Sequence, residues 1–307
     1  MRVAVDAWNL ADDGRGMGRY VRRILEDWRS VPDLEVTLLT RSLAEARGTF
    51  DAVWYPWNAI RFELRGARRV VTFYDAFAFT YPHRQWIARM REQRPIRRAM
   101  ARANERATIS HWSAQELART FGLDLSLFTI IPPVPDPFWQ PEAPPQRRPY
   151  FLVVTGPEER KNLPTLVRAH ARAYPRGEIE LLVAGNAPEA SIRPTDEELR
   201  ALYSGACAVA VPSSAEGYGL MTVEAMACGA PVIASDASAL PEAAGGAALL
   251  VSPFDVEAWS AALRRVGEDA TLRASMREAS LARAARIDRG APARATLALL
   301  RRSLEGA

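Results

Sequence analysis

Residues 206–235 read ACAVAVPSSAEGYGLMTVEAMACGAPVIAS. An apolar run ends at a proline, a loop with two glycines follows, and a helix is expected over 219–228 before a second apolar run ends in PVIAS. Strand, loop, helix and strand in this order predict a parallel βαβ unit. The glycines on either side of Tyr218 let the backbone approach a ligand at the start of the helix, and Glu216 and Glu224 are expected to point into the same pocket.

The same alternation of apolar runs and helical patterns extends in both directions along the chain. Strands are predicted at residues 2–8, 36–40, 52–55, 69–74, 107–110 and 128–132 in the first half, and at 150–156, 179–185, 206–212, 231–235 and 247–251 in the second half. Residues 132–149 contain eight prolines and can form neither a helix nor a central strand, so they are predicted to be a linker. The pattern therefore predicts two doubly wound, Rossmann-like α/β domains that face each other across a cleft.

The linker sets the predicted domain boundaries. Residues 1–145 form the expected N-terminal domain and residues 146–307 the expected C-terminal domain, whose terminal helices are expected to pack back on the first. A length of 307 residues fits two domains, and a content of 48% apolar and 25% charged residues excludes a disordered or fibrous chain. No apolar run is long enough to span a membrane and no secretion signal precedes the first strand. A cytoplasmic protein is expected, with Cys207 and Cys228 as buried, reduced thiols.

The basic residues are almost all of one type. The chain has 40 lysine and arginine residues, and all but Lys161 are arginine. Because arginine has replaced lysine everywhere else, this position is predicted to need a compact point charge rather than a planar guanidinium group.

Several enzyme classes are disfavoured by motifs that the sequence lacks. It has no GxxxxGK[ST], GxSxG or HExxH motif, no Cys/His cluster with metal-ligand spacing and no DxD pair, so P-loop NTPases, serine hydrolases and zinc enzymes are disfavoured and no metal site is predicted. The glycines at 14–18 stand too far from the first strand for a dinucleotide fingerprint. A loop that approaches a phosphate or a sugar is favoured there, and a plain βα turn is the alternative. An NADP-dependent reductase using Arg41 is the weakest interpretation.

The loop before residue 220 combines two kinds of polar group. Backbone N–H groups at the start of a helix suit an anion, whereas neighbouring carboxylates suit neutral hydroxyl groups. A nucleotide sugar carries both: its diphosphate fits the N–H groups, and its sugar and ribose hydroxyls fit Glu216 and Glu224.

The stretch EGYGLMTVE, residues 216–224, resembles the E-x7-E motif of the family-4 retaining glycosyltransferases, which have the GT-B fold. EAMACGAPVIASDASALPE, AALLVSPFDVEAW and the upstream GPEERKNLPTLVRAH are also similar to that family. In the first half, GMGRYVRRIL, VVTFYDAFAFTYP, ATISHWSAQEL and IIPPVPDPFW resemble its weaker markers. The similarity spans most of the chain and is most specific in the second half.

The resemblance implies roles for the matching residues. Glu224 would bind the ribose diol, Glu216 the hydroxyls of the donor sugar, and Lys161 the charge that develops on the diphosphate. The implied donor-binding set is Gly16, Gly18, Arg160, Lys161, Glu216, Gly217, Tyr218, Gly219, Leu220, Met221 and Glu224. The implied catalytic residues are Glu216, Lys161 and Asp75, and the sugar pocket or acceptor side is assigned to Tyr74, Asp75 and Ser110. The lysine charge would replace a metal ion, so no cofactor is implied.

Three features depart from the family pattern. Tyr74-Asp75 stands where the family usually has His-Asp, and tyrosine cannot carry a positive charge near neutral pH. Only residues 186–194 join the strand ending at 185 to the next helix, where the family normally has a further helix and strand that help to hold the nucleotide base. Pro157 follows Gly156 where the family often has an arginine.

Residues 84–106 form a predicted arginine-rich helix. Its arginines are Arg84, Arg89, Arg91, Arg94, Arg97, Arg98, Arg102 and Arg106, with Trp86, Ile87 and Met90 as an apolar flank. A solvated helix in an arginine-biased protein is the favoured interpretation, and peripheral contact with an anionic membrane, serving a lipid-linked acceptor, is the alternative. No motif supports binding of nucleic acid.

The sequence therefore predicts a retaining, metal-independent glycosyltransferase that moves a sugar from a nucleotide-diphosphate donor to a hydroxyl acceptor. GDP-mannose is the favoured donor, because RKN-type sequences resemble those of mannosyltransferases, and a UDP-sugar is next. The expected partners are the nucleotide sugar and a glycan or lipid-linked acceptor. A non-catalytic relative that binds nucleotide or glycan, and a GT-B sugar-nucleotide epimerase, are the alternatives.

Overall fold

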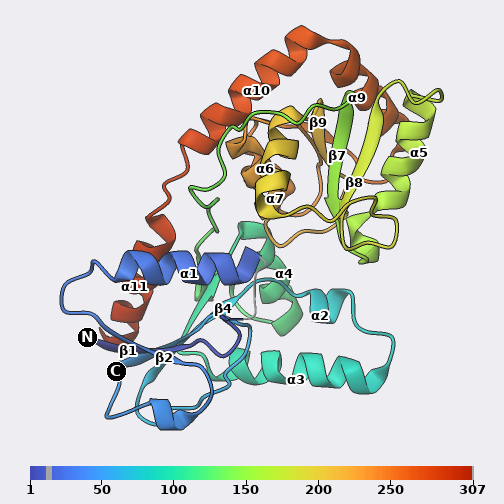
Figure 1. Cartoon of the computed structure of the whole chain (residues 1–307). Helices are drawn as coiled ribbons and strands as arrows, with labels where there is room; N and C mark the ends of the chain where they lie inside the picture. The colour runs from blue at the N-terminus through green and yellow to red at the C-terminus, as the bar shows by residue number, and fades with distance from the viewer. Residues whose placement is uncertain (12–15, 306–307) are drawn as a thin grey trace. The chain divides into compact units, whose positions relative to one another are not determined.

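The chain forms two compact units in the computed structural model, which describes residues 1–11 and 16–305 (Figure 1). The first unit contains Met1–Pro133 with Arg289–Ala307, and the second contains Val134–Asp288. Most of the predicted linker lies in the second unit, where Trp139 is 1% exposed and packs against Tyr203. The proline-rich segment is therefore part of a packed core for at least some of its length.

The first unit is built on a parallel sheet with strand order β2-β1-β3-β4-β5-β6. Its strands are β1 (Arg2–Asp6), β2 (Glu35–Leu39), β3 (Ala52–Tyr55), β4 (Arg68–Phe73), β5 (Glu105–Thr108) and β6 (Phe128–Ile130). Its helices are α1 (Gly16–Trp28), α2 (Phe77–Thr80), α3 (Trp86–Arg102), α4 (His111–Phe121) and α11 (Ala291–Glu305). The central strand β3 is buried along its whole length, as expected for a parallel strand covered by helices on both faces.

The C-terminal helix α11 belongs to the first unit and lies beside its strands (Figure 1). Trp28 Nε1 donates a hydrogen bond to the Ala293 carbonyl oxygen at 2.9 Å, which ties α1 to α11. Arg68 Nε of β4 donates to the Ser303 carbonyl oxygen at 2.6 Å. The end of the chain thus completes the core of the unit in which the chain begins.

The second unit is built on a parallel sheet with strand order β11-β10-β9-β7-β8. Its strands are β7 (Tyr150–Thr155), β8 (Glu180–Gly185), β9 (Ala208–Val211), β10 (Val232–Ser235) and β11 (Leu249–Val251). Its helices are α5 (Leu163–Ala173), α6 (Asp196–Gly205), α7 (Leu220–Ala227), α8 (Leu240–Ala244), α9 (Val256–Glu268) and α10 (Ala270–Ala285). One face of the sheet packs with α6 and α7 and the other with α5 and α9. Cys228 is buried, Cys207 is half-buried, and both are free thiols.

One predicted helix is too long. The helix expected over 84–106 ends at Arg102, because the backbone of Ala103 is extended and the chain enters β5 at Glu105. The side chain of Asn104 fixes this join, since its Oδ1 accepts the Arg69 N–H at 2.9 Å. Arg106 is consequently a strand residue rather than part of the arginine-rich helix.

Candidate functional site

The single lysine of the chain lies in a buried ion pair. Lys161 Nζ lies 2.7 Å from Glu216 Oε1, and the two side chains are 14% and 11% exposed. Lys161 ends a short 3₁₀ turn after β7, and Glu216 lies in the loop after β9. Since β7 and β9 are hydrogen-bonded neighbours, the carboxyl ends of two adjacent strands bring these residues together.

Asn162 holds the segment that contains Lys161 in place. It adopts the left-handed conformation with φ of 54°, which asparagine tolerates better than most residues, and it precedes α5. Its side-chain Nδ2 donates to the carbonyl oxygens of Pro212 and Pro253, and its Oδ1 accepts from Thr165 Oγ1 at 2.8 Å. The RKN segment is therefore held against the loop that carries Glu216.

Arg160 completes the charged cluster. Its Nη1 lies 3.3 Å from Glu216 Oε2 and donates to the Ala215 carbonyl oxygen at 3.1 Å. Burial raises the pKa of the Glu216 carboxyl, but the charges of Lys161 and Arg160 outweigh burial and hold that pKa below its ordinary value. Glu158 lies 3.6 Å from Arg160 but is half exposed, so solvent weakens its influence. Two cations, Lys161 and Arg160, thus lie beside the ionised Glu216 carboxylate, and a bound anion could pair with them.

The loop that contains Glu216 leads directly into α7, which begins at Leu220. Gly219 has φ of 98°, and a Cβ atom there would lie 2.7 Å from Leu240 Cδ2, so both conformation and space require glycine. Leu220 and Met221 are partly exposed in the first turn, whereas Gly217 and Tyr218 are buried. The first turn can therefore present backbone N–H groups to an anion, while Tyr218 and Gly217 shape the loop.

Glu224 lies on the second turn of the same helix and is 5% exposed. Its carboxylate helps to raise the pKa of the Cys228 thiol to about 12, although burial is the larger cause. Both acidic residues of the predicted pair therefore lie on the connection between β9 and β10, and both are largely buried.

The predicted residues of the first unit have structural partners. Tyr74 is buried, its N–H donates to Asn58 Oδ1 at 2.8 Å, and its ring lies edge-on to Tyr20 with centroids 6.3 Å apart. Asp75 Oδ1 accepts the Phe77 N–H at 2.9 Å at the start of α2. Ser110 is fully buried and caps α4, because its Oγ accepts the Ser113 N–H at 2.9 Å.

The glycine-containing loop after β1 is described only in part. Gly16 and Gly18 lie in the first turn of α1, where Gly18 is buried. Gly14, the first glycine of the loop, lies outside the described residues. Arg41, the arginine of the reductase alternative, donates its backbone N–H to Glu45 Oε1 at 3.0 Å.

Two residues of note were not singled out from the sequence. Ser238 has φ of 55°, and its Oγ accepts the Glu216 N–H at 2.9 Å, a role that no local pattern indicates. Asp6 is fully buried at the carboxyl end of β1, where its Oδ2 accepts the Arg61 N–H at 3.3 Å. Burial raises the pKa of Asp6 to about 6. The available signal for it is an acidic residue that directly follows the apolar run VAV of a predicted strand.

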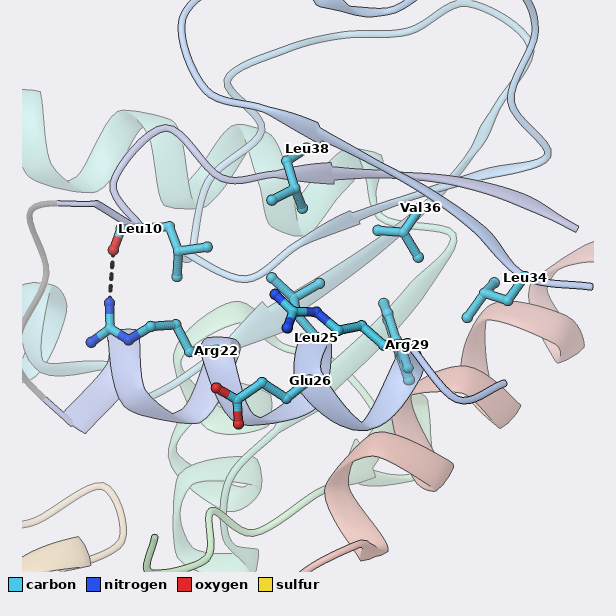
Figure 2. A pocket seen from close by; sticks show the side chains of 9 residues that line it. Leu10, Arg22, Leu25, Glu26, Arg29, Leu34, Val36 and Leu38 are labelled. Carbon is cyan, nitrogen blue, oxygen red and sulfur yellow. Dashed lines mark hydrogen bonds between the residues drawn. The ribbon is translucent and has the colours of Figure 1, made fainter. Parts of the chain in front are cut away.

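A groove of about 440 Å³ lies elsewhere on the first unit (Figure 2). It runs between α1 and the edge strand β2, and its apolar lining includes Leu25, Val36 and Leu38. Arg22 Nη1 closes one end by donating to the Leu10 carbonyl oxygen at 2.8 Å (Figure 2). None of the predicted site residues lines this groove.

Two kinds of feature are absent from the described part of the chain, residues 1–11 and 16–305. Within it, histidine, cysteine, aspartate and glutamate side chains form no group of three or more that could hold a metal ion. Among the same residues, no helix has the length and apolar character to cross a membrane.

The two parallel-sheet units have the GT-B fold, as predicted. The chain superposes on sucrose-phosphate synthase from Thermosynechococcus elongatus with a TM-score of 0.75 and 20% sequence identity, over 100% of both chains. At this identity the likeness establishes the fold alone.

Residues 148–269, in the second unit, match the family described as glycosyl transferases group 1. O-antigen chain mannosyltransferase B of Escherichia coli is 29% identical over 63% of this chain and 60% of its own length. MMP alpha-(1->4)-mannosyltransferase of Mycolicibacterium hassiacum is 30% identical over 60% of this chain and 49% of its own length. The chain thus spans 60% and 49% of the length of these two relatives, and the stretch similar to the group 1 glycosyl transferases, residues 148–269, lies in the second unit.

Proposed function

We propose that this protein is a retaining glycosyltransferase of the family-4 type, which moves a sugar from a nucleotide-diphosphate donor to a hydroxyl acceptor. The observation that carries the proposal is the buried cluster of Lys161, Arg160 and Glu216 beside the first turn of α7. It combines two cations, backbone N–H donors and a carboxylate, which come from the connections that follow β7 and β9. A diphosphate and a sugar present the matching groups.

The residues of the second unit have distinct proposed tasks. Lys161 and Arg160 would bind the diphosphate together with the N–H groups at Gly219–Met221, and Glu216 would accept hydrogen bonds from the sugar hydroxyls. Glu224 would accept those of the ribose. Because Lys161 and Glu216 hold each other at 2.7 Å, the diphosphate would take Lys161 from this pair and leave Glu216 oxygen atoms for the sugar.

The proposed reaction forms one bond and breaks one at the anomeric carbon. The acceptor oxygen attacks on the face that the diphosphate leaves, the bond between the anomeric carbon and the diphosphate oxygen breaks, and the acceptor proton passes to the leaving diphosphate. Lys161 stabilises the negative charge that develops on the diphosphate, the task that a metal ion performs in other enzymes. Transfer is therefore expected to need no metal.

GDP-mannose is the first donor to test and a UDP-sugar the second. Two of the similar relatives, those of Escherichia coli and Mycolicibacterium hassiacum, are named mannosyltransferases, which favours mannose. The proposed acceptor is a glycan or lipid-linked hydroxyl compound, and the proposed compartment is the cytoplasm. Tyr74 at the usual histidine position and the short 186–194 connection favour one second candidate, a relative that binds a nucleotide or a glycan without turnover.

A thermal-shift panel followed by a transfer assay tests the proposal. GDP, UDP, ADP and their sugars are added with EDTA and then with Mg²⁺, and a ligand at a hundredfold excess over its Kd stabilises the native protein by about 2.7 kcal/mol. The proposal expects a shift with one nucleotide family in EDTA and release of that nucleotide when donor sugar is consumed. A shift without consumption of any donor supports the binding-only relative. No shift with any nucleotide overturns the transferase and leaves only a relative that binds a glycan, which the same assay with a panel of glycans then tests.

A further inference from the structure

The first half of α3 stands apart from the packed core of its unit. Trp86, Ile87 and Met90 are 63%, 51% and 53% exposed, whereas the buried residues of the helix, Ile96, Ala99 and Met100, all lie in its second half. Figure 1 shows the beginning of α3 extending beyond the sheet while its end lies beside the strands. Three large apolar side chains that are close in sequence are therefore exposed on the surface of the unit.

The arginines of the two halves differ in their partners. In the second half, Arg98 and Arg102 bind Glu63 at 2.7 Å, and Arg97 lies over the Phe79 ring at 4.8 Å. In the first half, the exposed side chains of Arg91 and Arg94 have no hydrogen bond or ion pair with any residue of the described ranges 1–11 and 16–305. The fold uses the later arginines and leaves these two to solvent.

The uncovered apolar side chains and the two arginines share one side of the helix. At 3.6 residues per turn, Trp86, Ile87, Met90, Arg91 and Arg94 occupy an arc of about 140°. The buried residues Ile96, Ala99 and Met100 project from the opposite side. We call this set of five residues the α3 face.

We propose that the α3 face docks on the surface of a bilayer that contains anionic lipids. Trp86, Ile87 and Met90 would enter the boundary between headgroups and acyl chains, and Arg91 and Arg94 would pair with lipid phosphates. Tryptophan with aliphatic neighbours suits this boundary, and arginine close to an anionic surface adds attraction. The helix lies on the membrane in this arrangement and does not cross it.

The position of the α3 face gives the docking a purpose, and this step alone depends on the proposed transfer. In a parallel β–α–β crossover the helix starts at the carboxyl end of the sheet. The α3 face therefore lies at the same end of the first unit as Tyr74 and Asp75, which follow β4 directly. A lipid-linked acceptor held in the bilayer would be presented at that end.

Vesicle sedimentation with the full chain tests the docking without any donor or acceptor, so its outcome is independent of the transfer reaction. The probes are phosphatidylcholine vesicles with and without phosphatidylglycerol, at low and high salt. Binding is expected only with phosphatidylglycerol and is expected to weaken as salt rises. Absence of binding at low salt, or equal binding to pure phosphatidylcholine, overturns the proposal.

Two charge variants locate the surface. The double variant Arg91→Gln/Arg94→Gln is expected to bind about 25-fold more weakly, since each arginine near an anionic surface contributes about fivefold. The matched control is Arg168→Gln/Arg264→Gln, which removes two exposed helical arginines from the second unit and is expected to change binding less than twofold. Equal losses in both variants would mean that overall basic charge causes the binding and would overturn the assignment.

The apolar part has its own variant. Trp86→Ser/Ile87→Ser/Met90→Ser is expected to weaken binding at least tenfold and to leave a remainder that high salt removes. Phe254→Ser, which changes a 69% exposed side chain of the second unit, is the control and should bind as the unchanged protein does. Unaltered binding of the triple variant would show that no side chain enters the bilayer and would overturn insertion of this face. Unaltered melting temperatures verify that all variants fold.

Discussion

The carboxyl ends of the two sheets use their polar side chains in opposite ways. In the second unit, Lys161 and Glu216 bind each other in a buried cluster. In the first unit, Ser110 and Asp75 accept hydrogen bonds from backbone N–H groups at the starts of α4 and α2. A side chain that pairs with another side chain can exchange this partner for a ligand without loss of the fold. A side chain that caps a helix cannot do so without weakening that helix. The second unit therefore has the features of a ligand site. In the first unit, the residues predicted to bind substrate also stabilise the fold.

The largest expected effect is on catalysis through the ion pair. Lys161→Ala removes the charge that would stabilise the leaving diphosphate, and donor turnover is expected to fall about 10³-fold. Glu216 keeps Arg160 as a partner at 3.3 Å, so the fold should survive. Initial rates of nucleotide release under saturating donor measure the loss. Arg168→Ala, an exposed residue of α5, is the control, and normal turnover by Lys161→Ala would remove the role proposed for the single lysine.

The two units can also be compared by the loss of stability when a glycine with positive φ is replaced by alanine. Gly219 and Gly122 both have positive φ, but only at Gly219 would a Cβ meet another atom, the buried Leu240 Cδ2 at 2.7 Å. Gly219→Ala is expected to lower the free energy of unfolding by about 3 kcal/mol, and Gly122→Ala by about 1 kcal/mol. Urea unfolding measures both. Equal losses would show that the loop before α7 can relax and that its close packing is not what selects glycine.

Asp6 extends the comparison to pH. Burial raises its pKa to about 6 in the folded protein, above its ordinary 3.8, so the folded state holds this proton more tightly than the unfolded chain. The resulting stabilisation is present below about pH 4 and is lost as pH rises through about 6. Asp6→Asn is neutral throughout, so its stability relative to the unchanged protein should increase by about 2 kcal/mol between pH 4 and pH 7.

Melting temperatures across this range test the sign. Asp33→Asn, at an exposed position of the same unit, is the control and should follow the unchanged protein. A variant whose relative stability does not depend on pH would show that burial does not raise the pKa of the Asp6 carboxyl above its ordinary value of 3.8.

The same contrast separates what the sequence could predict from what it could not. The strands and the two doubly wound α/β units follow from alternating apolar runs, whereas the GT-B fold is implied by the resemblance of EGYGLMTVE to a known family. EGYG and RKN could be quoted from the sequence, but the 2.7 Å contact across neighbouring strands could not, because strand order is a long-range property. Ser238 and Asp6 were missed for the same reason: each acts on a segment distant in sequence.

The smallest expected effect decides whether Ser110 has any role beyond its cap. Ser110→Ala removes the acceptor for the Ser113 N–H and is expected to cost about 1 kcal/mol of stability, with a melting temperature a few degrees lower. Asp255→Ala removes the equivalent cap of α9 in the second unit, where the side chain accepts the Ala258 N–H at 2.9 Å, and should cost as much. Both variants are expected to keep donor turnover within twofold at a temperature where they remain folded. If Ser110→Ala alone loses turnover tenfold or more, the Ser110 hydroxyl contacts substrate as well as capping α4. The same oxygen atom of the first unit would then serve both the site and the fold.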